Sequence, residues 1–531
     1  MFTGRLFPYQ LDAVQAVVDQ EAILVAYSMG TGKTVITIAA VEQLLGDRTI
    51  RSALIIVPAS LKWQWAQRIA EFTDVERREV DLRGARLTVG ADEMCMVIHG
   101  DARQRAEQWE YVRLTCPDYV IASYNTIRND WDQILRTPFE AVVLDEATTI
   151  KNFASQITKL IKRLQPPRRI ALAGLPVENR PEEIYSIMEW VDPAVLGRWD
   201  LFDQSFIVRN YFGGVQRYRN LDLLHKRLRG SMIRKSRLDP EVAQHLPDVV
   251  EATRTVTLPA PTRVLYRRIM RDLTSALDEL GSSADSLDLA AYYAGASEGG
   301  ERTAQGRVMA RVLAARLLLD DPRLLMDSAV AFHEGRGEGS AYIAELVASL
   351  PTGVDLLAAP KLDELDRQVA AMLEEPGAKV AIFSTYRRML PYLAERLDKH
   401  ADLVTFHGEM NSFQKAGALQ RFSADEGCRI ILSTNAGGYG VDLPHAQFLV
   451  NYDLPDSRGV YDQRNTRHVR ASSTYEKVYV LNLIVEDSLE ERQLATLAMR
   501  GKLAGAIVDG RGDATLENDV PTLSEHLGRT L

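Results

Sequence analysis

The stretch AILVAYSMGTGKTVITIAAVEQLL, residues 22–45, decides the fold of this chain. A short apolar run leads into a glycine-rich turn, and a helix-like pattern of apolar residues follows the turn. Glycines in such a turn let backbone N–H groups surround phosphate oxygens, and the start of the helix adds a field that favours negative charge. The stretch therefore predicts a strand, a phosphate-binding loop and a helix in succession.

Six residues of this loop are candidates for binding a nucleotide, namely Met29, Gly30, Thr31, Gly32, Lys33 and Thr34. The ammonium of Lys33 should reach the β- and γ-phosphates, and the hydroxyl of Thr34 should ligate Mg²⁺. A glycine-rich turn after a strand can also be merely structural. The Lys-Thr pair between a strand and a helix favours the phosphate-binding interpretation.

Short apolar runs recur in two blocks of the chain. The first block comprises residues 22–27, 53–58, 119–124, 141–146 and 169–174, and the second comprises residues 380–385, 402–408, 429–434, 447–453 and 477–484. Polar or helical sequence follows each run, which is typical of buried parallel strands joined by crossover helices. The pattern predicts an α/β protein with two parallel-sheet lobes.

The sequence between the two blocks has apolar residues mainly at helical spacing. Small and polar residues at 294–306 indicate a loop, and those at 509–521 indicate a loose C-terminal tail. We therefore expect a first lobe over 1–190, helical protrusions over 191–360, a second lobe over 361–500 and a tail over 501–531.

The composition is ordinary for a soluble protein, with 46% hydrophobic and 25% charged residues among 531. No run of 18 apolar residues predicts a membrane helix, and the first residues lack the apolar stretch of a signal peptide. The three cysteines, Cys95, Cys116 and Cys428, form no CxxC pair and suit a reducing compartment. We expect a cytoplasmic monomer without a membrane partner.

The formal net charge of −9 argues against an overall basic surface. Residues 205–240 depart from this balance, because they carry nine Lys and Arg against two Asp. A basic groove can coexist with an acidic exterior, so this stretch is a candidate for lining a nucleic-acid track. The alternative is a solvated helix face.

Asp145 and Glu146 stand at the end of the apolar run AVVLDE. In open parallel sheets, the carboxyl ends of the strands face the ligand. We assign Asp145 to the metal, together with Thr34, and Glu146 to the attacking water. An isolated Asp-Glu pair can also be a solvated turn, but its position downstream of a phosphate loop favours the catalytic interpretation.

The stretch QRNTRHVR, residues 463–470, places Gln463, Arg467 and Arg470 close together in the second block. Guanidinium groups neutralise charge that develops on a γ-phosphate during transfer. We expect Arg467 and Arg470 to complete the phosphate site when the two lobes close, as arginine fingers do. The alternative is a basic helix face.

These motifs together resemble superfamily 2 helicases, specifically the Swi/Snf-type translocases. The resemblance covers about residues 5 to 500 and rests on RLFPYQ (5–10), LIIVPASLKWQWAQ (54–67), LDEATTIKN (144–152), ALAGLPVENRPEEIYSI (171–187), MIRKSRLDPEVAQHLPDVV (232–250), KLDELDRQVAAML (361–373), LSTNAGGYGVDLPHAQFLVNYDLP (432–455) and QRNTRHVR. It implies two RecA-like lobes with helical protrusions between them.

The resemblance also implies roles for further residues. Gln10 would read the base, and Gly438, Gly440 and Gln463 would lie at the nucleotide. Ser60, Lys62 and Thr434 would lie at the DNA strand. Gly174, Pro176 and Asn179 would link the state of the nucleotide to the grip on DNA.

The chain departs from the family pattern at two positions. Thr148 stands where the family usually has histidine, so the coupling of that side chain to the arginine motif is in question. Thr466 replaces the usual glycine before Arg467, and His468 is not assigned a family role. Asp145 and Glu146 are retained, so the change at Thr148 does not bear on hydrolysis itself.

The expected function is that of an ATP- and Mg²⁺-dependent translocase on double-stranded DNA that works without sequence specificity, and DNA-processing or transcription proteins are candidate partners. A strand-separating helicase on DNA or RNA is the first alternative, and a non-catalytic clamp is the second. Trp63 and Trp65 can stack on bases, but such residues more often pack beneath their own helix.

Overall fold

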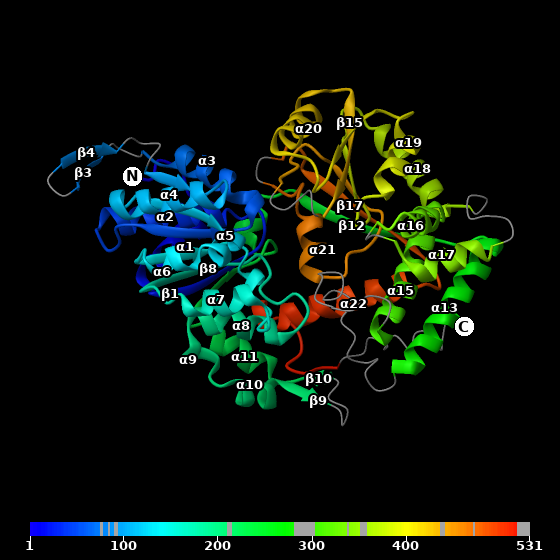
Figure 1. Cartoon of the computed structure of the whole chain (residues 1–531), viewed down its shortest axis with the longest axis horizontal. Helices are drawn as coiled ribbons and strands as arrows, with labels where there is room; N and C mark the ends of the chain where they lie inside the picture. Colours follow the sequence, from blue (N-terminus) through cyan, green and yellow to red (C-terminus); the bar gives the residue numbers. More distant parts are fainter. Residues whose placement is uncertain are drawn as a thin grey trace. The chain divides into compact units, whose positions relative to one another are not determined.

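The computed structural model describes residues 1–74, 78–82, 85–89, 94–209, 215–280, 303–336, 339–350, 358–435, 441–470 and 473–517. The chain divides into two compact units. Unit 1 comprises Met1–Val208, Arg217–His245 and Gly501–Leu516, and unit 2 comprises Arg209–Gln216, Leu246–Arg500 and Glu517–Leu531. Each unit contains its own parallel sheet (Figure 1), which confirms the predicted α/β fold with two parallel-sheet lobes.

The sheet of unit 1 has seven strands in the order β11-β1-β8-β7-β2-β6-β5, and all neighbouring pairs are parallel. The strands are β1 (Ala22–Tyr27), β2 (Ala53–Val57), β5 (Cys95–Val97), β6 (Tyr119–Ser123), β7 (Ala141–Leu144), β8 (Arg168–Leu172) and β11 (Met232–Lys235). Every residue of β2, β6 and β7 is buried. Burial on both faces explains the continuous apolar runs.

The helices of unit 1 precede, connect or follow its strands along the chain. They are α1 (Pro8–Asp19), α2 (Lys33–Gly46), α3 (Lys62–Phe72), α4 (Ala102–Thr115), α5 (Tyr124–Asn129), α6 (Trp131–Leu135), α7 (Gln156–Arg163), α8 (Pro181–Val191), α9 (Pro193–Leu196), α10 (Trp199–Phe206), α11 (Leu221–Leu228) and α12 (Pro240–Ala243). Polar side chains fix several starts. Asp101, for example, accepts a hydrogen bond from the Gln104 amide in a capping box before α4.

The sheet of unit 2 has six parallel strands in the order β12-β17-β16-β13-β15-β14. They are β12 (Asp248–Val256), β13 (Val380–Ser384), β14 (Asp402–Phe406), β15 (Cys428–Thr434), β16 (Phe448–Asn451) and β17 (Lys477–Val485). One hydrophobic core joins this sheet to helices of the middle region. The described helices of unit 2 are α13 (Ala260–Leu280), α15 (Ala304–Asp320), α16 (Arg323–His333), α17 (Ala341–Ala348), α18 (Pro360–Leu373), α19 (Met389–Leu397), α20 (Ser412–Ala424) and α21 (Arg458–Asn465), and α22 (Leu489–Ala504) belongs to unit 2 as far as Arg500.

Each of the ten apolar runs named from the sequence overlaps a strand of one of the two large sheets. The described part of the middle region is mainly helical, as expected, but it also contains strands, since β11 joins the sheet of unit 1 and β12 joins that of unit 2. Two small sheets accompany the large ones. One pairs β3 (Arg78–Leu82) with β4 (Ala85–Val89), and the other contains β9 (Ile207–Arg209), β10 (Val215–Tyr218) and β18 (Leu516–Glu517).

The segment Gly501–Leu516 belongs to unit 1. A π-helical segment, η6 (Gly505–Asp509), buries Ala506, Ile507 and Val508, and the His225 ring of α11 lies 3.0 Å from the Ile507 carbonyl. Part of the predicted loose tail is therefore ordered, since β18 also falls within it. The domain boundaries drawn from the sequence stay predictions.

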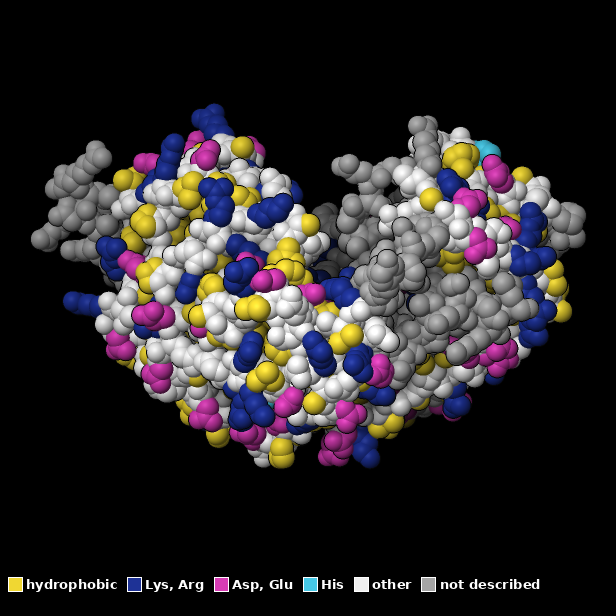
Figure 2. All heavy atoms as spheres, turned by 90° about the horizontal axis from the view of Figure 1, so that it is seen from below, with side chains coloured by type: hydrophobic (Ala, Val, Ile, Leu, Met, Phe, Trp, Pro, Cys, Tyr) yellow, Lys and Arg dark blue, Asp and Glu magenta, His cyan; other side chains and the backbone are white. Residues whose placement is uncertain are grey.

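The surface carries mixed charge. Figure 2 shows basic, acidic and apolar side chains interspersed over one face. Within the basic stretch 205–240, several cations have partners in unit 1: Arg234 pairs with Asp509 at 2.6 Å, Lys226 with Asp222 at 3.5 Å, and Lys235 with Glu241. The proposed nucleic-acid track along this stretch stays a prediction. Among the described residues, no helix is long and apolar enough to cross a lipid bilayer.

Candidate active site

The predicted phosphate loop lies between β1 and α2, at the carboxyl end of β1. Gly30 and Gly32 have φ angles of 82° and 88°, in the left-handed region that glycine adopts most readily. Space is also limited at Gly32, because an added Cβ would lie 2.4 Å from Nε2 of Gln10. The conformation of the loop therefore explains both glycines.

Lys33 is the first residue of α2, and its ammonium lies over the loop. Its Nζ donates hydrogen bonds to the carbonyl of Tyr27 at 2.8 Å and to that of Ser28 at 3.2 Å. Charged phosphate oxygens are stronger acceptors than these neutral carbonyls, so the ammonium is placed to exchange one set for the other. Thr34 follows at the N-terminal turn of α2, where the helix dipole favours anions.

Gln10 and Met29 fix the loop from two sides. The buried Gln10 amide donates to the Thr31 carbonyl at 3.0 Å and accepts from the Phe7 amide at 2.9 Å. Met29 lies against Gly174, where an added Cβ would come within 2.8 Å of the Met29 side chain. The loop is thus tied to α1 and to the segment after β8. The role of Gln10 in reading the base stays a prediction.

Asp145 follows β7 and is buried. Its Oδ2 accepts a hydrogen bond from Nε1 of Trp65 at 2.7 Å, and its Oδ1 accepts from the amide of Glu146 at 3.0 Å. The Tyr124 hydroxyl donates to its carbonyl at 2.8 Å. Burial raises the pKa of Asp145, while the Trp65 hydrogen bond and the positive charge of Lys33 oppose that rise. Lys33 and Asp145 therefore lie within electrostatic reach of each other.

Glu146 has a φ angle of +49°, which is unusual for a residue with a side chain. Backbone strain of this kind clusters at functional sites, and here it lies two residues after the end of β7. The predicted assignment of Glu146 to water stays a prediction.

The residues that follow the Asp-Glu pair are tied to the segment containing Asn179. Lys151 pairs with Glu178 and lies 3.7 Å from Glu183. Glu183 also accepts hydrogen bonds from the amides of Glu178, at 2.6 Å, and Asn179, at 2.8 Å. Burial raises the pKa of Glu183, and the Lys151 charge opposes this. The network connects the segment after the Asp-Glu pair to the one that was expected to link the state of the nucleotide to the grip on DNA.

The predicted DNA contacts have different surroundings. Ser60 is exposed, whereas the ammonium of Lys62 donates to the Ile98 carbonyl at 2.8 Å. Thr434 is buried at the end of β15. Gly438 and Gly440 lie outside the described residues. The DNA and nucleotide roles of these residues stay predictions.

Arg467 and Arg470 both contact the segment 441–443 of unit 2. Nη1 of Arg467 donates to the Val441 carbonyl at 2.8 Å, and Nη2 of Arg470 lies 2.5 Å from Asp442. Gln463 lines a small pocket with Arg464 and Arg467. The structure thus groups the three predicted residues of this motif, and their action on a phosphate stays a prediction.

Comparison with known families agrees with these motifs. The model of the SNF2-related domain matches residues 9–313, more than half of the chain. The chain belongs to the SNF2-related family. In this SNF2-family chain, residues 360–472 also match the helicase conserved C-terminal domain.

Individual relatives are distant. The chain is 24% identical to the ISWI chromatin-remodeling complex ATPase ISW1 of Saccharomyces cerevisiae, over 95% of this chain and 41% of that protein. It is 24% identical to the putative ATP-dependent helicase/translocase YwqA of Bacillus subtilis, over 92% of this chain and 47% of that protein. The chain thus spans less than half the length of these two curated relatives.

A solved structure supports the fold alone. The helicase domain of Pyrococcus furiosus Hef is 18% identical and superposes with a TM-score of 0.51, covering 92% of this chain and 98% of that one.

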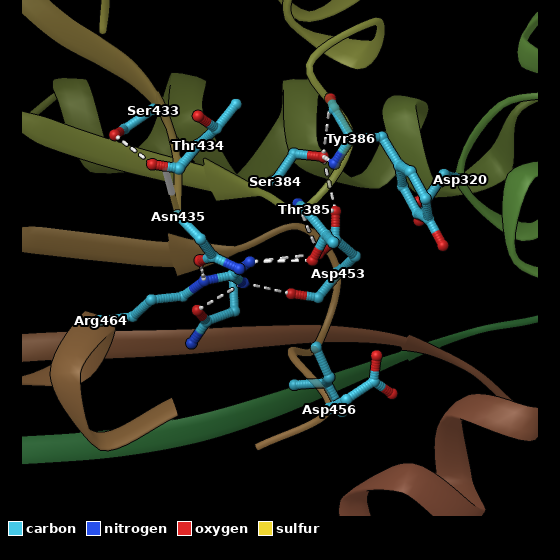
Figure 3. Close-up of polar contacts among 12 residues, drawn as sticks. Asp320, Ser384, Thr385, Tyr386, Ser433, Thr434, Asn435, Asp453, Asp456 and Arg464 are labelled. Atoms are coloured by element: carbon cyan, nitrogen blue, oxygen red, sulfur yellow. Dashed lines mark hydrogen bonds and ion pairs between the residues drawn. The ribbon is translucent and has the colours of Figure 1, made fainter. Parts of the chain in front are cut away.

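Sequence reasoning missed Arg464, which forms the centre of a polar network in unit 2 of the SNF2-family chain (Figure 3). This buried guanidinium donates to the Asn435 side chain at 2.5 Å, the Asp453 carbonyl at 2.7 Å and the Thr385 hydroxyl at 3.0 Å. The Asp453 carboxylate in turn accepts from the Ser384 hydroxyl at 2.5 Å. Burial lowers the pKa of Arg464, and Asp453 opposes this. The network joins the ends of β13, β15 and β16 to α21.

A second missed cluster is the ionic triad Lys361, Asp320 and Glu490, which is almost fully buried in unit 2. The ammonium of Lys361 lies 2.8 Å from Asp320 and 2.5 Å from Glu490. Burial alone would lower the pKa of Lys361, but the two carboxylates raise it above its ordinary value. The triad ties α15, α18 and α22 together.

The two tryptophans named from the sequence differ in burial and in their contacts. Trp65 is buried and contacts Asp145, while Trp63 is 57% exposed and packs beside His99 with ring centroids 5.3 Å apart. The packing alternative holds for Trp65. The sequence offered one signal for this contact, a tryptophan one helical turn after a loop predicted to contact DNA. The pairing itself could not be predicted, because Asp145 lies 80 residues away in the sequence.

Proposed function

We propose that this chain is an ATP hydrolase that uses the energy of hydrolysis to move along double-stranded DNA. The observation that carries the hydrolase part is the pairing, within one sheet, of a glycine loop holding Lys33 with a buried strand-end carboxylate, Asp145. Lys33 follows β1 and Asp145 follows β7 of the same sheet, and the positive charge of Lys33 opposes the rise in the pKa of Asp145 that burial causes. Nucleotide hydrolysis needs a cation that binds the phosphates and, close to it, a carboxylate that holds the metal.

The same residues fit Mg²⁺. A hydroxyl at Thr34 and a carboxylate at Asp145 are oxygen ligands, which Mg²⁺ prefers, and the ion usually completes its shell with water and phosphate oxygens. This agrees with the absence, among the described residues, of any cluster of three or more side chains able to cage a metal. When bound, Mg²⁺ would neutralise charge on the phosphates.

The remaining groups act on water and charge. Glu146 would orient the attacking water, and Lys33 would stabilise the negative charge of the transferred phosphoryl group. Arg467 and Arg470 would add further positive charge, and Gln463 would help to place the nucleotide. These assignments follow from the family pattern and the chemistry of the side chains.

The DNA part of the proposal draws support from the relatives, which are named as a chromatin-remodeling ATPase and a helicase/translocase. Ser60, Lys62 and Thr434 would contact the phosphate backbone. Backbone contacts carry little sequence information and weaken as salt concentration rises. Binding is therefore expected to be salt-sensitive and sequence-independent.

The choice of nucleic acid is tested by the rate of phosphate release with duplex DNA, single-stranded DNA, RNA or none. We expect duplex DNA to give the largest stimulation. Displacement of the third strand from a triplex, without unwinding of a forked duplex, would support translocation. Unwinding of the fork would favour the strand-separating helicase, and the absence of phosphate release under all conditions would favour a non-catalytic clamp.

Glu146→Gln is expected to lower kcat by roughly 100- to 10,000-fold, because the amide no longer accepts the proton of the attacking water. The affinity for ATP should change little, since the phosphate loop is intact. Single-turnover hydrolysis and equilibrium nucleotide binding measure the two effects. Glu107→Gln on the exposed face of α4 is the control, and equal rates for both variants would remove Glu146 from the chemistry.

A further inference from the structure

The side chain of Trp65 crosses from α3 to the strand end that carries Asp145. Trp65 lies one turn after Lys62, the first residue of α3, and is only 2% exposed. Its indole Nε1 donates to Oδ2 of Asp145 at 2.7 Å. The bond joins a rigid, fully packed ring to a carboxylate that would otherwise rotate about two torsions.

The two hydrogen bonds to the Asp145 carboxylate do not use all the lone pairs that its oxygens could offer to a metal. Oδ2 receives the indole N–H, and Oδ1 receives the Glu146 amide. Each carboxylate oxygen has two lone pairs, so each retains one for another ligand. Both donors are neutral, so neither cancels the negative charge that would attract Mg²⁺. The Tyr124 hydroxyl holds the main chain of the same residue.

We propose that Trp65 is a positioning residue that presets the Asp145 carboxylate for the Mg²⁺–nucleotide complex. The inference rests on the proposed function, because it assumes that Asp145 is a metal ligand. Hydrogen bonds to metal ligands typically contribute 10- to 100-fold to metal affinity or activity by fixing ligand orientation. Loss of the indole N–H therefore weakens the response to Mg²⁺ while leaving the phosphate loop intact.

The test uses Trp65→Phe in the full chain, since phenylalanine keeps an aromatic ring but has no donor. Equilibrium binding of a fluorescent ATP analogue is measured in EDTA and over a series of Mg²⁺ concentrations. We expect binding in EDTA to stay within about twofold of the original chain, and the Mg²⁺ concentration at half-maximal effect to rise roughly 10-fold. The Mg²⁺ dependence of ATP hydrolysis should shift in parallel.

Trp109→Phe is a matched control. Trp109 is also fully buried in unit 1, and its Nε1 donates to the carboxylate of Asp130 at 3.0 Å, within the α4–α5 region. This variant loses the same kind of bond away from the nucleotide. Its Mg²⁺ requirement should equal that of the original chain.

The outcomes separate the inference from the proposed function. An unchanged Mg²⁺ requirement in Trp65→Phe, or an equal rise in Trp109→Phe, would overturn the positioning role. Failure of the unaltered chain to bind the nucleotide more tightly with Mg²⁺ would instead overturn the proposed function. Should Trp65→Phe not fold, Trp65→Met removes the donor with a flexible side chain that fills the same space, and the same outcomes apply.

Discussion

Replacing Lys33 by alanine is expected to lower the rate of ATP hydrolysis by roughly 100- to 1,000-fold, the typical cost of removing one preorganised group that stabilises a transition state. The ammonium donates hydrogen bonds to the carbonyls of Tyr27 and Ser28, so it is already held at the loop that would bind the phosphates. Phosphate release with saturating duplex DNA measures the effect.

The loop itself should survive this substitution. The φ angles of Gly30 and Gly32 and the hydrogen bond from Gln10 to Thr31 do not depend on the Lys33 side chain. Circular dichroism should therefore be unchanged. Lys159→Ala, an exposed position on α7, is the control for a lost positive charge. DNA-stimulated hydrolysis that persists in Lys33→Ala would contradict the assignment of the site.

Replacing Lys361 by methionine is expected to lower the free energy of unfolding of unit 2 by about 3–5 kcal/mol, because Asp320 and Glu490 would remain buried without their cation. Lys361 and Asp320 are at most 1% exposed, so water cannot substitute for the lost partner. Differential scanning calorimetry measures the loss, and hydrogen exchange of β15 and β17 peptides locates it in unit 2.

Two further variants define the cause of this effect. Arg421 also lies between two carboxylates, Asp402 and Asp425, but all three side chains are at least 44% exposed. Arg421→Met should therefore lower the free energy of unfolding far less than Lys361→Met does, because water screens an exposed ion pair. Adding Asp320→Asn and Glu490→Gln to Lys361→Met should restore part of the stability. Equal losses in Lys361→Met and Arg421→Met would show that burial of the triad is unimportant.

The sequence predicted the parts of the fold that depend on local pattern. The run AILVAY corresponds to β1 residue for residue, because a strand covered on both faces must be apolar throughout. β12 escaped notice for the opposite reason: it lies at the edge of its sheet with mostly exposed side chains, so it lacks a continuous apolar run. β11 was missed because it is only four residues long.

The candidate site was predictable where its residues lie within one motif. The glycines and Lys33 of the phosphate loop are consecutive, and their chemistry is readable from spacing alone. Trp65, Arg464 and Lys361 were not assigned their roles, because each acquires its role from a partner elsewhere in the chain. Lys361, for instance, meets Glu490 129 residues later. A buried charge is recognised only once the surrounding structure is known.

The packing of η6 against α11 affects the order in which the two units can be completed during synthesis. Most of unit 1 precedes unit 2 in the chain, yet Ile507, Val508 and the Asp509 partner of Arg234 belong to unit 1 as well. During synthesis, the ribosome releases almost all of unit 2 before these residues emerge, and domains generally fold as units. The segment of unit 1 that follows unit 2 in the chain is therefore added late, and unit 1 is completed only after most of unit 2 has been synthesised.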